Sequence, residues 1–311
     1  MSHCQRPFPK YERKVRRSCD GDRLRIAQFS SSLPAVLICD NVYCALARQA
    51  IRAGQYAQGI AYSQQAIALL EETPERFWLA HSFFNLGSSY AHLGELASAQ
   101  HSFTQMRQLG EAMGDRRVQS YAAWNMGRVL INKREYEAAI TMGRHALALA
   151  TTNPFNVALV LYTLGWAYLE QGEAAQAIST LAQALDLFRQ MQDQTMQGMV
   201  MARLGEAYLV RGDVGQAYDL AHQGLAVAIA SHVQMAMRAA QRVLGRIALA
   251  RGALAEAETH LQEALRLCDS TQEQYGLGIT HLDLARLAHA QGNPEAVTTH
   301  LREARTLFSA L

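Results

Sequence analysis

The chain has 311 residues, of which 50% are hydrophobic, and a formal net charge of +2. It can therefore bury a sizeable core, and it lacks the overall positive charge that would attract nucleic acid. Its five cysteines match no metal-binding or redox spacing, which indicates free thiols in a reducing, cytoplasmic compartment. No apolar run approaches the ~20 residues that a membrane-spanning helix needs.

The first 32 residues differ in character from the rest of the chain. Residues 1–25 contain eight Lys or Arg residues and three Asp or Glu residues. We expect residues 1–32 to form a basic, disordered tail. The alternative is electrostatic attachment to an acidic partner or to nucleic acid, and no interleaved aromatic residues favour nucleic acid. The stretch LPAVLIC that follows could be a signal-peptide core. Pro34 interrupts its apolar run, however, and Ile38 is too bulky for a cleavage site.

From about residue 40 onward, one pattern returns at steps of 40 residues, with a single step of 38. Its first marker is the small residue of a Leu-Gly or Leu-Ala pair: Ala47, Gly87, Gly127, Gly165, Gly205, Gly245 and Ala285. The second marker follows seven residues later: Gly54, Gly94, Arg134, Gly172, Gly212, Gly252 and Gly292. So regular a period predicts a solenoid over residues 33–311. Its repeats lie near 40–79, 80–119, 120–157, 158–197, 198–237, 238–277 and 278–311.

Each marker has a physical reason to be small or flexible. A glycine inside a helix costs about 1 kcal/mol relative to alanine, so the first marker indicates close approach of a second helix. The second marker is expected to end the first helix in the left-handed conformation. Asp213 and Asn293 then suit the N-cap of a second helix, and Pro294 suits its first position. Each repeat is thus predicted to be a pair of antiparallel helices.

The pattern resembles the tetratricopeptide repeat (TPR), on residues that include Leu164-Gly165, Tyr168, Gly172, Ala177 and Leu181. The period is longer than the usual ~34 residues and the closing proline is mostly missing. This is similar to the longer repeats of kinesin light chains, LGN-type adaptors and sensor domains of bacterial transcription regulators. The resemblance covers about residues 40–311. It implies an all-α, right-handed superhelical solenoid of about seven repeats, whose first helices line a concave surface that holds peptides or partner proteins.

The resemblance also implies which side chains line that surface. Asn85 and Asn125 precede the Leu-Gly pair, where an amide can hydrogen-bond the backbone of a bound peptide. The alternative for both is a hydrogen bond to a neighbouring repeat. The other candidates are Arg48, His92, Trp124, Arg128, Tyr162, Trp166, Arg203, Arg242, Arg246 and Arg286. The aromatic ring of Phe84 is expected nearby.

These side chains predict a groove with aromatic character in repeats two to four and arginine character in repeats five to seven. Such a groove would suit an acidic or carboxylate-bearing peptide with an apolar anchor. Two alternatives stay open: the arginines pair with internal carboxylates such as Glu206, and the rings pack between helices.

The remaining features point to association and away from catalysis. The sequence has no phosphate loop, no nucleophile elbow and no HExxH motif, so we expect no enzyme activity, no cofactor and no metal site. For Met191, Met196, Met199 and Met201, core filling is favoured over an adaptable binding surface. The final helix is expected to leave Leu301, Leu307, Phe308 and Leu311 near an uncovered edge, which favours association, including a homodimer.

We therefore predict a non-catalytic scaffold or adaptor that binds a peptide segment of a partner protein. The alternative is a regulatory sensor in which a peptide or metabolite changes the shape of the superhelix. A third interpretation is an accessory subunit of an enzyme, which is a scaffold with a catalytic partner.

Overall fold

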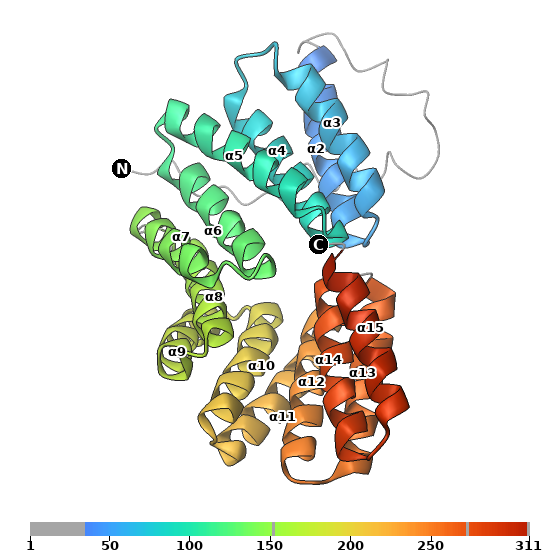
Figure 1. Cartoon of the computed structure of the whole chain (residues 1–311). Helices are drawn as coiled ribbons and strands as arrows, with labels where there is room; N and C mark the ends of the chain where they lie inside the picture. Colours follow the sequence, from blue (N-terminus) through green and yellow to red (C-terminus); the bar gives the residue numbers. More distant parts are fainter. Residues whose placement is uncertain (1–34, 151–152, 272–273, 310–311) are drawn as a thin grey trace.

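A computed structural model describes residues 35–150, 153–271 and 274–309 (Figure 1). The basic tail, Pro34 and Leu311 lie outside these residues. The described chain forms fourteen α-helices. They are α2 (Ala35–Arg52), α3 (Tyr56–Leu70), α4 (Arg76–Leu93), α5 (Leu96–Met113), α6 (Arg116–Asn132), α7 (Tyr136–Leu149), α8 (Pro154–Gln171), α9 (Ala174–Gln190), α10 (Gln194–Arg211), α11 (Val214–Ala230), α12 (Gln234–Ala250), α13 (Leu254–Thr271), α14 (Gln274–Ala290) and α15 (Pro294–Ser309).

The helices form seven pairs, α2–α3 to α14–α15, which confirms the predicted all-α solenoid. The glycines inside the first helices lie where the second helix approaches. At Gly165, a Cβ atom would lie 2.6 Å from Cγ of Leu181 in α9, closer than packed side chains allow. Glycine at this position therefore lets the two helices of a pair meet.

The turn within each pair follows the expected chemistry. Gly172 and Gly212 end their helices with φ of 89° and 91°, in the left-handed region that favours glycine. Arg134 occupies the same repeat position with φ of 63° and so adopts this conformation without being glycine. Asp213 accepts a hydrogen bond from the Gln216 N–H (3.3 Å), and Asn293 accepts one from the Ala296 N–H (3.0 Å), as predicted for N-caps.

The pairs stack into a curved array. Each second helix packs against the first helix of the next pair, and first helices also pack against first helices of adjacent pairs. The array therefore bends towards the first helices, which line its inner face. Figure 1 shows the curve running from α2 and α3, through α8, to α14 and α15.

The largest apolar cluster lies in the middle of the array and includes the fully buried rings of Phe103 and Phe188. The methionines of α10 belong to it: Met201 is buried, and Met196 and Met199 pack against it together with Met191. The structure thus supports core filling for these side chains. Cys44 and Cys268 are buried: the Cys44 Sγ lies 3.0 Å from the Ser82 hydroxyl, and the Cys268 Sγ lies 3.7 Å from the Thr280 hydroxyl. No helix among the described residues is both long and apolar enough to cross a bilayer.

Candidate functional site

The inner face of repeats two and three carries a continuous series of rings, which we call the aromatic row. Its members are Phe77, Trp78, His81 and Phe84 of α4, and Tyr121 and Trp124 of α6. Ring centroids of successive members lie 4.9 to 6.5 Å apart, mostly edge to face. This range is typical of favourable aromatic pairs, so the rings hold one another in place across the two helices.

The aromatic row is partly open to solvent. Phe77 has 40% of its surface exposed, and the other members are half-buried. Trp124 is fixed at the far end because its Nε1–H donates to Oγ1 of Thr163 (2.8 Å) in α8. The row therefore presents an ordered surface that combines apolar ring area with a few polar atoms.

Two arginines flank the aromatic row. The Arg128 guanidinium lies 5.5 Å from the centre of the Trp124 ring and donates to Oδ1 of Asn125 (3.3 Å). Arg48 of α2 is exposed, and its charge acts on His81 of the row. Burial lowers the pKa of His81, and the charge of Arg48 lowers this pKa further, so the row contains a neutral imidazole at neutral pH.

The two predicted amides face into the protein. Asn85 is 4% exposed, and its Nδ2–H donates to the carbonyl of Cys44 (3.3 Å) in the preceding repeat. Asn125 is 1% exposed and donates to the carbonyl of Tyr121 (2.8 Å) in its own helix. For Asn85 the structure thus shows the inter-repeat hydrogen bond that the sequence left open. Peptide binding by either amide stays a prediction.

The arginines of repeats five to seven meet two buried carboxylates in what we call the arginine cluster. Glu206 of α10 accepts hydrogen bonds from Arg203 (3.1 Å), Arg242 (2.5 Å) and Arg246. Asp283 of α14 accepts hydrogen bonds from Arg242 (2.8 Å) and Arg286 (2.6 Å). These contacts join the first helices of three consecutive repeats.

The charges of the arginine cluster are paired with carboxylates of the same chain. Burial alone would raise the pKa of Glu206, but the charges of Arg242, Arg246 and Arg203 outweigh burial and hold this pKa well below its usual range. Arg242 and Arg203 are almost completely buried beside their partners, whereas Arg286 has a side chain that is 61% exposed. The alternative of internal pairing therefore describes these arginines, and their contact with an anionic ligand stays a prediction.

The remaining predicted residues lie in packed surroundings. Tyr162 is buried in the central apolar cluster. Trp166 is also buried; its Nε1–H donates to Oε1 of Glu170 (2.9 Å), and the Arg203 guanidinium lies 4.4 Å from its ring centre. His92 stacks on Tyr56 of α3, with ring centroids 4.6 Å apart.

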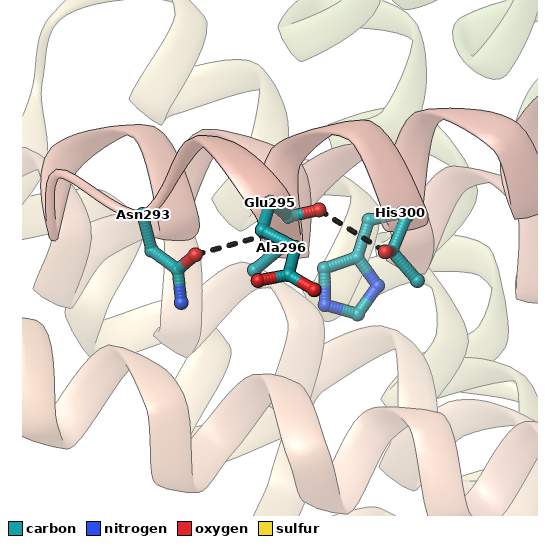
Figure 2. A pocket seen from close by; sticks show the side chains of 5 residues that line it. Asn293, Glu295, Ala296 and His300 are labelled. Atoms are coloured by element: carbon teal, nitrogen blue, oxygen red, sulfur yellow. Dashed lines mark hydrogen bonds between the residues drawn. The ribbon is translucent and has the colours of Figure 1, made fainter.

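A separate open pocket lies on α15 and its N-cap (Figure 2). Its lining is Asn293, Glu295, Ala296, Thr299 and His300. Two polar contacts in Figure 2 lie within the helix, because Asn293 caps Ala296 and the Thr299 hydroxyl donates to the Glu295 carbonyl (3.0 Å), whereas the His300 ring lies 3.1 Å from His281 of α14. Across the part of the chain that the structure describes, no group of three His, Cys, Asp or Glu residues could hold a metal ion.

Sequence reasoning missed four members of the aromatic row: Phe77, Trp78, His81 and Tyr121. A signal was present, because Phe77, His81 and Phe84 are spaced by four and three residues and so share one helix face. Tyr121 occupies the repeat position of His81, six residues before the marker glycine. An alignment of aromatic residues across repeats would have found the row.

Comparison with known families now places the fold. The family described as "MalT-like TPR region" matches residues 125–310, and the family described as "Tetratricopeptide repeat" matches residues 39–111. The chain belongs to the MalT-like TPR family. This confirms the predicted tetratricopeptide repeats. A comparison of this MalT-like TPR chain with curated proteins finds no match.

Solved structures with the same fold include a Rap protein complexed with competence and sporulation factor. Its TM-score is 0.74 at 16% identity, over 88% of this chain and 77% of that chain. The Rap conjugation gene regulator of plasmid pLS20, in complex with the Phr* peptide, has a TM-score of 0.72 at 14% identity, over 94% and 81%. For aspartyl phosphate phosphatase F from Bacillus subtilis, the TM-score is 0.70 and the sequence identity is 14%. The match covers 88% of this chain and 70% of the phosphatase chain. At these identities the likeness shows a shared solenoid fold.

Proposed function

We propose that the protein is a non-catalytic scaffold or adaptor that binds a peptide segment of a partner protein on its inner face, along the aromatic row. The observation that carries this proposal is the row itself, an ordered and partly exposed ring surface that crosses two repeats. Rigid aromatic surfaces supply most of the binding energy at many protein interfaces. The Rap structure with the Phr* peptide supports the proposal, because that protein has the same fold and was solved with a peptide.

The chemistry of the row indicates the class of peptide. Rings favour an extended segment with apolar or aromatic side chains, and the flanking Arg48 and Arg128 favour an acidic side chain or a terminal carboxylate beside them. The arginine cluster contributes less, since each of its four arginines is already paired with Glu206 or Asp283. We therefore place the ligand mainly on repeats two and three, with Asn85 and Asn125 positioning the helices beneath it.

A test begins with selection of peptides on the wild-type protein from a random-peptide phage library. Labelled peptides from that selection are then measured by fluorescence anisotropy. The double variant Phe77→Ala/His81→Ala removes two rings of the row, and Arg128→Glu reverses the flanking charge. Each variant is expected to weaken binding at least about tenfold, as loss of an interface hot spot does.

Matched controls lie on second helices, away from the inner face. Tyr218→Ala removes a half-buried ring of α11, and Arg144→Glu reverses an exposed charge of α7. Both controls should retain wild-type affinity, and circular dichroism should show every variant to be helical. If the aromatic-row variants also bind like wild type, the ligand uses another surface and the proposal is wrong.

A regulatory sensor is the second candidate. The pLS20 relative is a gene regulator with a bound peptide, and the inner face of this chain carries a ring contact between distant repeats, described below. Small-angle X-ray scattering with and without a selected peptide separates the two functions. A change in radius of gyration supports the sensor, whereas unchanged dimensions support the scaffold. A homodimer through the last repeat and a cytoplasmic location stay predictions.

A further inference from the structure

Tyr275 lies at the start of α14, in the same repeat position as Phe77 of the aromatic row, ten residues before the small marker residue. It is buried, although its helix belongs to the last repeat of the array. Its ring centroid lies 5.8 Å from that of Trp166 in α8, at an interplanar angle of 67°. Tyr275 therefore packs against a helix more than one hundred residues earlier in the chain.

The contact spans helices that are not neighbours. The first helices pack in the order α8, α10, α12 and α14, and Figure 1 shows this sequence along the lower half of the molecule. Tyr275 thus reaches across the inner face, past two intervening helices. Curvature of the array brings the two rings together, because a small rotation at each of three interfaces adds up between α8 and α14.

The last helix completes the contact. The ring of Phe308 in α15 lies 6.1 Å from that of Tyr275, and its Cζ is 2.8 Å from where a Cβ atom of Gly278 would be. Glycine at position 278 thus lets Phe308 lie against the α14 backbone. Phe308 was expected near an uncovered edge. The structure corrects this, because the ring is half-buried against Tyr275 on the inner side, whereas Leu301 of the same helix is 47% exposed.

Charged groups also hold Trp166. Its indole N–H donates to Glu170, and Arg203 lies over its ring and is paired with Glu206. Contacts within repeats four and five thus hold Trp166 in place, whereas Tyr275 contacts it from the last repeat. Neighbouring repeats are joined along whole helices, whereas α8 and α14 are joined by side chains, so this contact is the first to open when the superhelix widens.

We propose that Tyr275, backed by Phe308, forms an intramolecular latch on Trp166 that closes the C-terminal half of the superhelix and opens reversibly. In the closed state, Tyr275 covers one side of Trp166. Opening uncovers Trp166 and Arg203 on the inner face and frees the ring of Tyr275. A partner side chain directed at Trp166 must therefore displace Tyr275 first. The latch depends only on contacts within the chain and not on whether the aromatic row binds a peptide.

The test uses the full chain with Trp166 as the single fluorescent reporter, obtained by Trp78→Phe and Trp124→Phe. Tyr275→Ala removes the latch ring, and Tyr275→Phe keeps it. Loss of an aromatic contact of this kind shifts a two-state equilibrium roughly two- to tenfold. Tyr275→Ala should therefore raise acrylamide quenching of Trp166, shift its emission to longer wavelength and increase the radius of gyration in X-ray scattering. Tyr275→Phe should match the parent.

Two further variants guard against a simple folding defect. Phe308→Ala leaves Tyr275 in place and removes its support, so it should shift quenching in the same direction by a smaller amount. Tyr218→Ala removes a ring of α11 that also contacts a histidine and an arginine, and it should change nothing. If Tyr275→Ala and Phe308→Ala both remain helical and show parental quenching and dimensions, Trp166 is not covered by a latch and the proposal is overturned.

Discussion

At the scale of single residues, the protein separates two kinds of polar side chain on its inner face. Arg242 and Glu206 are buried, the Arg203 side chain is only 11% exposed, and both arginines pair with Glu206. Arg48 and Arg286 remain exposed. A buried charge must be paired to be tolerated, and an exposed one need not be. The first group therefore holds repeats together, and the second remains accessible to ligands.

Removal of the Glu206 charge should be strongly destabilising. Glu206→Gln leaves three guanidinium groups without their shared carboxylate, and breaking a buried ion pair in this way costs about 3 kcal/mol or more. The measurement is urea denaturation followed by circular dichroism. Glu111→Gln, which breaks the exposed Arg107–Glu111 pair, is the control and should change the free energy of unfolding by less than about 0.5 kcal/mol. Equal effects of the two variants would contradict a structural role for the arginine cluster.

His81 should make the protein less stable in mild acid. Burial, followed by the charge of Arg48, lowers its pKa in the folded state below the ordinary value of 6.5. The unfolded chain therefore takes up this proton first as the pH falls. The contribution of His81 is fully present above about pH 6.5 and is lost progressively below it.

The check is the free energy of unfolding of wild type and His81→Gln across that pH range. The variant should show a flatter dependence below about pH 6.5, where the unfolded imidazole takes up its proton. The other histidines are common to both proteins, so the difference isolates His81. Parallel pH profiles would mean that this imidazole is as accessible to protons in the folded protein as in the unfolded chain.

At the scale of helices, the marker residues determine how closely two helices approach and where each helix ends. Gly165 permits α8 and α9 to meet, and the left-handed Gly172 ends α8 so that α9 can return along it. Propensity alone would disfavour glycine within a helix. The glycine persists because the contact with Leu181 leaves no room for a side chain.

Substitution of Gly165 by alanine should therefore destabilise the protein despite the better helix propensity of alanine. The new Cβ atom would lie 2.6 Å from Cγ of Leu181, and such overpacking costs about 1–3 kcal/mol. Gly215→Ala in α11 is the matched control, because nothing lies within 4 Å of the added atom. That control should gain about 0.5–1 kcal/mol. The measurement is thermal unfolding of the two variants. If both substitutions increase stability, the two helices do not approach closely at Gly165.

At the scale of the whole molecule, the two halves of the inner face differ. The N-terminal half presents the aromatic row to solvent, and the C-terminal half fills its own inner face with the arginine cluster and the contact between Tyr275 and Trp166. A terminal repeat normally frays, because it has a neighbour on one side only. Here α14 is also bound to α12 through Asp283 and to α8 through Tyr275.

Hydrogen exchange should report this asymmetry. The amides of α14 are expected to exchange about as slowly as those of α12, whereas those of α2, at the other end of the described array, should exchange faster. Mass spectrometry of peptide fragments after exchange in native buffer measures the difference. Equal and fast exchange in α2 and α14 would show that the long-range contacts do not stabilise the last repeat.

The sequence by itself determined the repeat, the helix pairs and their turns, because these depend on local rules that recur every 40 residues or so. Gly165, Gly172 and Asp213 carry that information in their own positions. It also indicated an inner face rich in aromatic residues and arginine. It did not show that Arg242 is neutralised by Glu206 and Asp283, which come from repeats on either side.

Tertiary structure alone decided which side chains are exposed and which distant ones meet. Whether Asn85 faces a ligand or Cys44 depends on how one repeat is placed on the previous one. The meeting of Trp166 and Tyr275 depends on curvature summed over several interfaces, which no local pattern encodes. The repeat unit is a property of neighbours in sequence, and the site is a property of how seven such units bend.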